Sequence, residues 1–265
     1  MSVAVLDCQR ALSDNQMRMV NATRAANARK VDALREQWFG GDVHPYRLLE
    51  QRVAATLAPG ATLLDAGCGR TAPVLTKFRA QAGRLVGIDL VEFAPDIPGC
   101  ELYRRDLAAT GLEDGCVDVI YSRSVFEHLD DPASVLREFQ RVLRPGGRVL
   151  VLTASLWDYA TLIARLVPNR FHARIVERTE GRAGEDVFPT RYRCNTRRAV
   201  MRHAARAGLV PGRFDYVGQY PAYFAFSPRL FSLASRYEFF LRRHRRLQPL
   251  LGWILFELVK PRANG

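Results

Sequence analysis

Several features that mark secreted or membrane-spanning chains are missing from these 265 residues. No run of about 18 uncharged apolar residues is present, the length that a helix needs to cross a bilayer. The first ten residues lack a basic stretch followed by an apolar one, so we expect no secretory signal there. The 5 cysteines are odd in number and form no C-x-x-C pair, which argues against a disulfide framework or a cysteine zinc site. We therefore expect a cytoplasmic protein without a bound metal.

Acidic residues are scarce in the C-terminal part of the chain. Residues 1–160 contain 19 Lys and Arg against 20 Asp and Glu, whereas residues 161–265 contain 20 against 7. This imbalance favours an anionic partner, such as a phosphorylated substrate, a membrane surface or nucleic acid. A solvated, arginine-rich surface explains the same numbers without any partner. The basic residues form no identifiable base-reading motif, so we expect no specific nucleic acid.

The composition is otherwise that of a globular protein with a sizeable core, because 48% of the residues are apolar and 25% are charged. Residues 1–58 are predicted to form helices that act as a lid or cap. The first spans residues 13–39, and the second runs from Pro45 to about Leu57, since proline suits the first turn of a helix. Residues 59–265 are predicted to form one α/β domain.

Apolar strands alternate with helices through the middle of the chain. Strands are predicted at residues 62–65, 84–89, 101–104, 117–122 and 148–153, and helices at 73–80 and 132–143. Nearly all-apolar strands in such an alternation indicate a parallel sheet covered on both faces. A ligand site is then expected at the carboxyl ends of the strands, where the strand order reverses.

The last third of the chain departs from this simple alternation. Helices are predicted at residues 156–167, from Asn195 or Thr196 to Ala207, and at 228–247; strands are predicted at 213–219 and 252–260. Two stretches, at about 155–194 and 220–250, are interpreted as insertions on the acceptor side of the site.

Polar residues gather at the predicted carboxyl ends of the strands. Asp65 ends the first strand, and Gly67 and Gly69 follow it. The two glycines permit a positive φ and a close approach of a ligand to the backbone, and the helix that follows would turn free N–H groups toward it. Asp89 and Asp106 follow the next two strands, which suits a nucleoside whose ribose hydroxyls meet Asp89 and whose exocyclic amine meets Asp106.

Two classes of ligand fit these residues. The segment from Gly67 to Ala72 matches G-x-G-x-x-A, the pattern of a dinucleotide site. The acidic rim instead suits a ligand that carries positive charge, such as a sulfonium with an α-amino group. Both classes remain open at this point.

A family resemblance is carried by five motifs: LLDAGCG, VGIDL, RRDL, VDVIYSRSVFEHLDDP and LRPGGRVLVLT. In combination they resemble the class I S-adenosylmethionine (SAM)-dependent methyltransferases, in particular a small-molecule branch that includes quinone-biosynthesis enzymes. The resemblance covers about residues 45–153. It implies a Rossmann-like, mostly parallel seven-stranded sheet with helices on both faces and an antiparallel final strand. It also implies SAM as the cofactor.

The resemblance also implies which residues hold the cofactor. Asp65, Gly67 and Gly69 would line its methionine part. Thr71 stands where the family has a third glycine, and it would contact the cofactor instead. The remaining implied contacts are Asp89 and Leu90 at the ribose, Asp106 and Leu107 at the adenine, and Ser122 and Arg123 on the far side of the pocket.

The stretch after the fourth strand would lie beside the methyl group. Methyl transfer is an in-line displacement in which positioning does most of the work, and an oxygen or nitrogen nucleophile also needs its proton removed. His128 has a suitable ordinary pKa, near 6.5. The alternative is that Glu127 and His128 only tie the following helix to the sheet. Residues of the first insertion are the candidates for binding the methyl acceptor, namely His172, Arg191, Tyr192 and Arg193.

The function predicted first is methyl transfer from SAM to a small-molecule, glycan or lipid-linked acceptor. One alternative is an NAD-binding Rossmann oxidoreductase. Another is a non-catalytic protein with this fold that binds a membrane or nucleic acid.

The helix predicted at residues 228–247 combines apolar and basic residues. Leu230, Leu233, Tyr237, Phe240 and Leu241 share one face at helical spacing, and Phe231 widens that face. Six arginines against one acid partly flank it, as in a helix that lies at a membrane interface. We therefore predict peripheral contact with the anionic inner face of a membrane. The alternative is that this face packs on the core of the protein.

Overall fold

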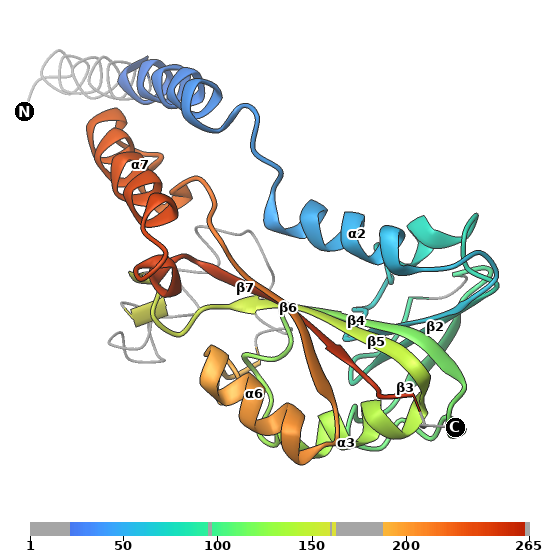
Figure 1. The fold of residues 1–265 in the computed structure, drawn as a ribbon. Helices are drawn as coiled ribbons and strands as arrows, with labels where there is room; N and C mark the ends of the chain where they lie inside the picture. The colour runs from blue at the N-terminus through green and yellow to red at the C-terminus, as the bar shows by residue number, and fades with distance from the viewer. Residues whose placement is uncertain (1–21, 95–96, 160, 163–187, 263–265) are drawn as a thin grey trace, which may run out of the picture. The chain divides into compact units, whose positions relative to one another are not determined.

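The computed structural model describes residues 22–94, 97–159, 161–162 and 188–262 (Figure 1). The chain divides into two compact units. The sheet unit comprises Val43–Gly218 and Arg245–Gly265, and the helical unit comprises Met1–Asp42 and Gln219–His244. This division differs from the predicted boundary after residue 58, because the helix that begins at Pro45 packs on the sheet.

The sheet unit contains one seven-stranded sheet in the order β3-β2-β1-β4-β5-β7-β6. The first five strands in the chain are mutually parallel, and β7 is antiparallel to both of its neighbours. The order reverses between β1 and β4, which is the switch point where ligands bind in sheets of this kind. The predicted fold class is confirmed. The strands are β1 (Thr62–Ala66), β2 (Arg84–Asp89), β3 (Glu101–Arg104), β4 (Val117–Arg123), β5 (Leu143–Ala154), β6 (Val210–Val217) and β7 (Trp253–Val259).

Helices cover both faces of this sheet (Figure 1). α3 (Pro132–Val142) and α6 (Arg197–Arg206) cover one face, and α2 (Pro45–Thr56) covers the other together with the 3-10 turn η1 (Leu75–Phe78). Successive strand residues point to opposite faces, so Leu64 enters the core under α3 while its neighbour Leu63 enters the core under α2. Burial on both faces explains why the strands are nearly all apolar.

The two helices on the α3 side begin at side-chain caps. Asp131 Oδ1 accepts hydrogen bonds from the N–H groups of Ala133 and Ser134, and Thr196 caps α6 through the N–H of Ala199. The predicted cap at Thr196 is confirmed. A second 3-10 turn of this unit, η4 (Gln248–Leu250), precedes β7.

The prediction of a helix at residues 73–80 is wrong, because only the four-residue η1 forms there. Ala72 has a φ of 43°, outside the helical region, and Pro73 follows it directly. Val74 and Thr76 are β-branched and favour a helix weakly, and β2 begins soon afterwards at Arg84. Too few residues remain for a stable helix.

Other predicted limits differ less from the structure. β5 begins at Leu143 rather than residue 148, β6 spans Val210–Val217 rather than 213–219, and the helix predicted at 228–247 ends at Arg243. Of the helix predicted at 156–167, residues 159, 161 and 162 are helical and residues 160 and 163–167 lie outside the described residues.

The helical unit is built on aromatic packing between a helix at residues 22–39 and α7 (Pro228–Arg243), with the short turn η3 (Ala222–Phe224) before α7. The ring centroids of Phe39 and Phe231 lie 6.3 Å apart, and those of Trp38 and Phe239 lie 5.4 Å apart. The predicted role of the first helix as a lid stays a prediction. Among the residues that the model describes, no helix is both long enough and apolar enough to span a membrane.

Candidate functional site

The two glycines after β1 have opposite surroundings. Gly67 has a φ of 92°, and a Cβ built on it would lie 2.2 Å from Cγ2 of Val125. Gly69 has a φ of 70°, and no heavy atom would lie within 4 Å of a Cβ there. Gly67 is therefore needed to fit the chain against the loop after β4, whereas the space beside Gly69 is open to a ligand.

The loop departs from a three-glycine pattern in the place that the sequence suggested. The third positive φ falls on Ala72, at 43°, and Thr71 is an exposed turn residue. Because a β-branched residue resists a positive φ, the chain moves the strained conformation one residue onward. The predicted contact of Thr71 with a cofactor stays a prediction.

Asp89 closes this loop from the end of β2. Its Oδ2 accepts a hydrogen bond of 2.8 Å from the N–H of Gly69, and its Oδ1 accepts bonds of 2.7 and 3.2 Å from the N–H groups of Leu90 and Val91. The carboxylate is half-buried, and the donors that hold it in the described part of the chain are all backbone N–H groups. The side chain of Leu90, next to it, is exposed.

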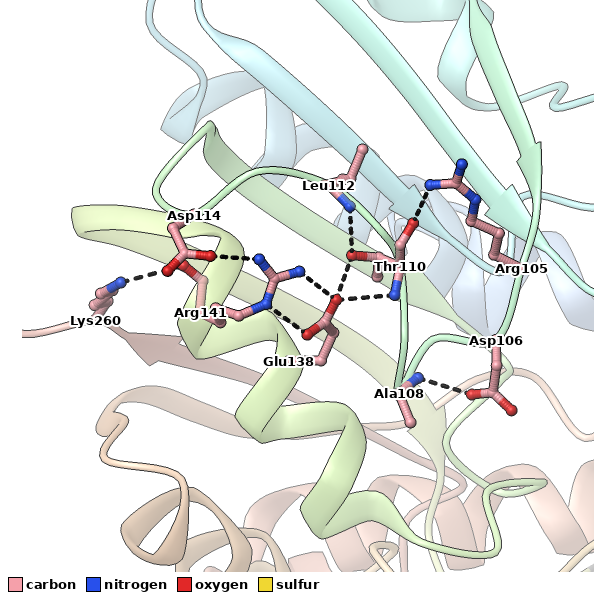
Figure 2. A network of polar contacts seen from close by, with 9 residues as sticks. All are labelled: Arg105, Asp106, Ala108, Thr110, Leu112, Asp114, Glu138, Arg141 and Lys260. Atoms are coloured by element: carbon pink, nitrogen blue, oxygen red, sulfur yellow. Dashed lines mark hydrogen bonds and ion pairs between the residues drawn. The ribbon is translucent and has the colours of Figure 1, made fainter.

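The loop after β3 carries Asp106 and Leu107 and is fastened to α3 (Figure 2). Glu138 Oε1 accepts from both the N–H and the hydroxyl of Thr110, at 2.8 and 2.5 Å. Arg141 bonds both oxygens of Glu138, and together with Thr110 it lowers the pKa of that carboxyl to about 2. Asp106 itself is exposed and, among the described residues, its carboxylate accepts only from the N–H of Ala108, at 2.7 Å, so the loop presents further lone pairs of this carboxylate.

Asp65 is the buried acid of the site. Residues 65 and 121 are paired in the register of β1 and β4, and the Tyr121 hydroxyl donates a hydrogen bond of 2.5 Å to Asp65 Oδ2. Burial raises the pKa of Asp65 from 3.8 to about 7, although the Tyr121 hydroxyl and the nearby Arg123 both lower it. A cation placed beside this carboxyl would favour its ionised form.

The residues at the end of β4 are already engaged within the protein. The hydroxyl of Ser122 is buried and donates to the carbonyl oxygen of Ala66, which ties β4 to β1. The guanidinium carbon of Arg123 lies 4.5 Å from the ring centroid of Tyr46 on α2. Arg123 Nη1 also lies 4.0 Å from a carboxylate oxygen of Glu50.

Tyr46 reaches the same edge from α2 and was not predicted. Its hydroxyl lies 3.3 Å from the hydroxyl of Ser124, and its ring makes an edge contact with Trp253 at 5.5 Å. Ser124 has a φ of 56°, a strained conformation of the kind that clusters at functional sites. The sequence gives no signal for Tyr46, because α2 precedes every motif of the site.

Glu127 is the buried acid of the loop after β4. Its Oε2 accepts a hydrogen bond of 2.5 Å from the Thr153 hydroxyl, which in turn accepts one of 2.9 Å from Asn195 Nδ2. Burial raises the pKa of this carboxyl. Its backbone oxygen accepts from the N–H groups of Arg191 and Tyr192, at 2.6 and 3.0 Å. Glu127 thus joins the ends of β4 and β5 to the segment before α6, and not to the helix that follows it, α3, as the structural alternative had it.

His128 is less buried than Glu127 and is oriented by the backbone. Its Nδ1 lies 3.3 Å from the carbonyl oxygen of Pro189, and its ring centroid lies 6.3 Å from that of Phe188. Because a carbonyl oxygen can only accept, this hydrogen bond requires the proton on Nδ1. The lone pair of the neutral ring then lies on Nε2.

The predicted acceptor-binding residues are brought to this loop in part. Arg191 Nε lies 2.9 Å from Asp130 Oδ1, and Arg193 donates to the backbone oxygen of Asp130 at 2.7 Å. Tyr192 lies between them with a φ of 53°. His172 lies outside the described residues. No group of three or more metal-ligating side chains occurs in the described part of the chain.

Comparison with known proteins gives the family. A model of the "Methyltransferase domain" family matches residues 64–151. The ubiquinone biosynthesis O-methyltransferase of Pseudomonas paraeruginosa is 32% identical over 158 residues, which cover 52% of this chain and 67% of the relative. A 37.1 kDa protein of transposon TN4556 from Streptomyces fradiae is 40% identical over 114 residues, which cover 39% of this chain and 33% of that protein.

A solved structure supports the same fold at lower identity. The S-adenosylmethionine-dependent methyltransferase of Mesorhizobium loti has a TM-score of 0.54 at 18% identity, over 83% of this chain and 99% of that one. This chain spans about a third of the transposon protein and two thirds of the Pseudomonas enzyme. The sheet order, the glycine loop at its switch point and these matches agree, and the chain belongs to the class I SAM-dependent methyltransferases, a family of enzymes.

Proposed function

We propose that this chain transfers a methyl group from SAM to a small-molecule or lipid-linked acceptor. The observation that carries the proposal is the edge formed by the ends of β1, β2 and β3. An open glycine, a half-buried carboxylate and an exposed carboxylate follow these three strands, at Gly69, Asp89 and Asp106. Their chemistry fits a ligand with hydroxyl and amine donors.

The buried end of this edge fits a cation. Asp65 has a single hydrogen-bond partner among the described residues, Tyr121, and its pKa is raised by burial. A ligand with an α-amino group and a sulfonium supplies the positive charge that this carboxyl lacks. In this proposal the methionine part of SAM lies toward Asp65, and the ribose and adenine lie toward Asp89 and Asp106.

The cofactor, when bound, supplies a methyl group on a sulfonium that a nucleophile can attack. The chain contributes the position of the acceptor and the removal of its proton. His128 is the base in this proposal, because Pro189 holds its Nδ1 and leaves the lone pair on Nε2. Tyr46, Ser124 and the segment 191–193 lie around the same loop and form the side of the site that receives the acceptor.

In this proposal the acceptor is a small molecule with a hydroxyl group. The matched Pseudomonas relative is named as an O-methyltransferase of ubiquinone biosynthesis, which favours a small acceptor with a hydroxyl group. A hydroxyl nucleophile also gives a base such as His128 a proton to remove.

The dinucleotide alternative loses its main structural support. A pyrophosphate is bound by the free N–H groups and the dipole of a helix that follows the glycine loop. Here that helix is replaced by the four-residue η1, which supplies almost no dipole. Asp65, two residues before the first glycine of the loop, would also repel a phosphate group placed there.

The test is calorimetry of the purified chain with SAM, S-adenosylhomocysteine and NAD, together with mass spectrometry of any ligand that copurifies. We expect both sulfur ligands to bind and NAD not to bind. Binding of NAD without binding of SAM would overturn the proposal.

A further inference from the structure

α7 is apolar on two sides, and only one of them is covered by the described residues of the helical unit. The inward side carries Phe231 and Leu241, which are buried. Phe231 and Phe239 pack on Phe39 of the helix at residues 22–39, with ring centroids 6.3 and 5.3 Å apart. The prediction that Phe231 and Leu241 belong to the apolar face with Leu230 is therefore wrong, because both turn inward.

The outward side of α7 carries four large apolar side chains. They follow one another in steps of three, four and three residues, so they form one stripe along the helix. They are Leu230, Leu233, Tyr237 and Phe240, exposed by 42%, 65%, 41% and 50%. Phe226, just before the helix, is exposed by 69% and extends the stripe. A contiguous apolar stripe of this size on a surface marks an interaction site.

Arginines border this stripe at a regular interval. Arg229, Arg236 and Arg243 are exposed and lie seven residues apart, which places them on the same side of the helix. Among the residues that the structure describes, these three form no ion pair. Arg242 differs, because it lies on the inward side and pairs with Asp42 and Glu238. The charge beside the stripe is therefore not neutralised within the described helical unit.

We propose that this outward face of α7, defined by the apolar stripe and its three arginines, binds the surface of anionic lipid membranes. A helix that lies in the interface places its apolar face at the level of the acyl chains. Its arginines then meet the lipid phosphates in charge-assisted hydrogen bonds. The proposal goes beyond methyl transfer, and it gives a lipid-linked acceptor a route to the enzyme.

The charge pattern favours a lipid surface over other occupants. Nucleic acid attracts the arginines but gives no reason for four exposed apolar side chains beside them. A second copy docked through the same face about a two-fold axis would bring like-charged arginines together. An anionic membrane offers acyl chains to the apolar stripe and phosphate groups to the arginines that border it.

The test is co-sedimentation of the full chain with vesicles of phosphatidylcholine alone and of phosphatidylcholine mixed with phosphatidylglycerol. We expect binding to the anionic vesicles at low salt, weaker binding at high salt and no binding to the neutral vesicles. Replacing Arg229, Arg236 and Arg243 together by Gln is expected to weaken binding at least about tenfold.

A matched control removes the same charge elsewhere. Arg198, Arg202 and Arg206 are exposed on α6, and replacing these three by Gln is expected to change binding less than about twofold. Leu233→Ser with Phe240→Ser tests the stripe and is expected to weaken binding as strongly as the α7 arginine variant. Both positions are exposed, so the fold should persist.

Three results would overturn the proposal. The first is no binding of the unchanged chain to anionic vesicles at low salt. The second is an equal loss of binding in the α6 and α7 arginine variants. The third is vesicle binding that the variant with Leu233→Ser and Phe240→Ser leaves unchanged. That result would mean that the arginines recognise phosphate groups alone, as they would in nucleic acid. Calorimetry of S-adenosylhomocysteine with each variant reports on the proposed methyltransferase site separately.

Discussion

The proposed site has two sides that are built in different ways. On the proposed cofactor side, after β1, β2 and β3, backbone N–H groups hold the acids, as those of Gly69 and Ala108 hold Asp89 and Asp106. On the proposed acceptor side, after β4 and β5, side chains from distant segments hold one another, as Glu127, Thr153 and Asn195 do. The first side depends on backbone donors that almost every residue supplies, whereas the second depends on particular side chains that only the assembled sheet brings together.

The two sides meet at Gly67. Val125, on the acceptor side, occupies the space where a Cβ of residue 67 would lie, whereas Gly69 faces open space on the cofactor side. One glycine of the loop therefore serves the packing of the protein, and the other leaves the open space that the proposed cofactor would use. Gly67→Ala acts where the two sides meet, and the other substitutions below each act on one side.

The largest effect is expected from Gly67→Ala. The new Cβ would lie 2.2 Å from Val125, at a φ of 92°. Overpacking and backbone strain together should lower the free energy of unfolding by about 2–5 kcal/mol and abolish cofactor binding. The measurement is urea denaturation followed by circular dichroism.

Gly69→Ala is the matched control for that change. It carries a similar positive φ, 70°, but meets no heavy atom within 4 Å, so we expect a loss of only about 1 kcal/mol. Val125→Ala should recover part of the stability lost in Gly67→Ala. Equal destabilisation by the two glycine substitutions would contradict the different surroundings of Gly67 and Gly69.

His128→Ala tests the acceptor side alone. If Nε2 removes the proton of the acceptor, turnover should fall about 100-fold or more while the dissociation constant of SAM changes less than about twofold. The assay uses the acceptor identified from the purified chain and compares initial rates with calorimetry. Unchanged turnover would leave His128 as a residue that only anchors the loop to Pro189.

Asp89→Ala tests the cofactor side alone. Loss of hydrogen bonds to the ribose, worth about 1.5–3 kcal/mol when charge-assisted, should weaken SAM binding more than about tenfold. Because Asp89 also holds the N–H groups of Gly69 and Leu90, the variant should lose some stability. Asp89→Asn keeps one acceptor oxygen and should show a smaller loss of affinity. An unchanged dissociation constant would remove Asp89 from the site.

The sequence predicts the cofactor side better than the acceptor side, for a physical reason. β2 and β3 match their predicted limits at Arg84–Asp89 and Glu101–Arg104, because apolar runs and following acids are local signals. Even on the cofactor side, the contact of Tyr121 with Asp65 was not predicted, because it depends on which strands are neighbours and no local pattern encodes that order. The same holds for Tyr46, which reaches Ser124 across 78 residues of chain.

The wrong helix at residues 73–80 has a different origin. Its composition permits a helix, but the backbone of Ala72 is turned to a positive φ by the loop before it. Tertiary geometry overrides local propensity in this way when a segment is short. The strained residue lies between Thr71 and Pro73, and the β-branched side chains at Thr71, Val74 and Thr76 were the local signs against a helix.

The smallest effect is expected from pH, acting through the Asp65–Tyr121 pair on the cofactor side. Burial raises the pKa of Asp65 from 3.8 to about 7, so the free chain holds this proton below neutral pH. A bound cation lowers that pKa, and SAM affinity should therefore rise several-fold between about pH 6 and pH 8 and then level off. Without ligand, pH acts on the stability of the fold in the opposite direction. Between about pH 4 and about pH 7 the folded chain binds more protons at Asp65 than the unfolded chain does, so the contribution of Asp65 to stability falls as the pH rises.

Tyr121→Phe removes the hydrogen bond that lowers the pKa of Asp65, so the plateau in SAM affinity should move to higher pH. Calorimetry across this range, in two buffers that differ in ionisation enthalpy, measures both the affinity and the protons released. Affinity independent of pH, with no proton release, would show that Asp65 does not face the cation.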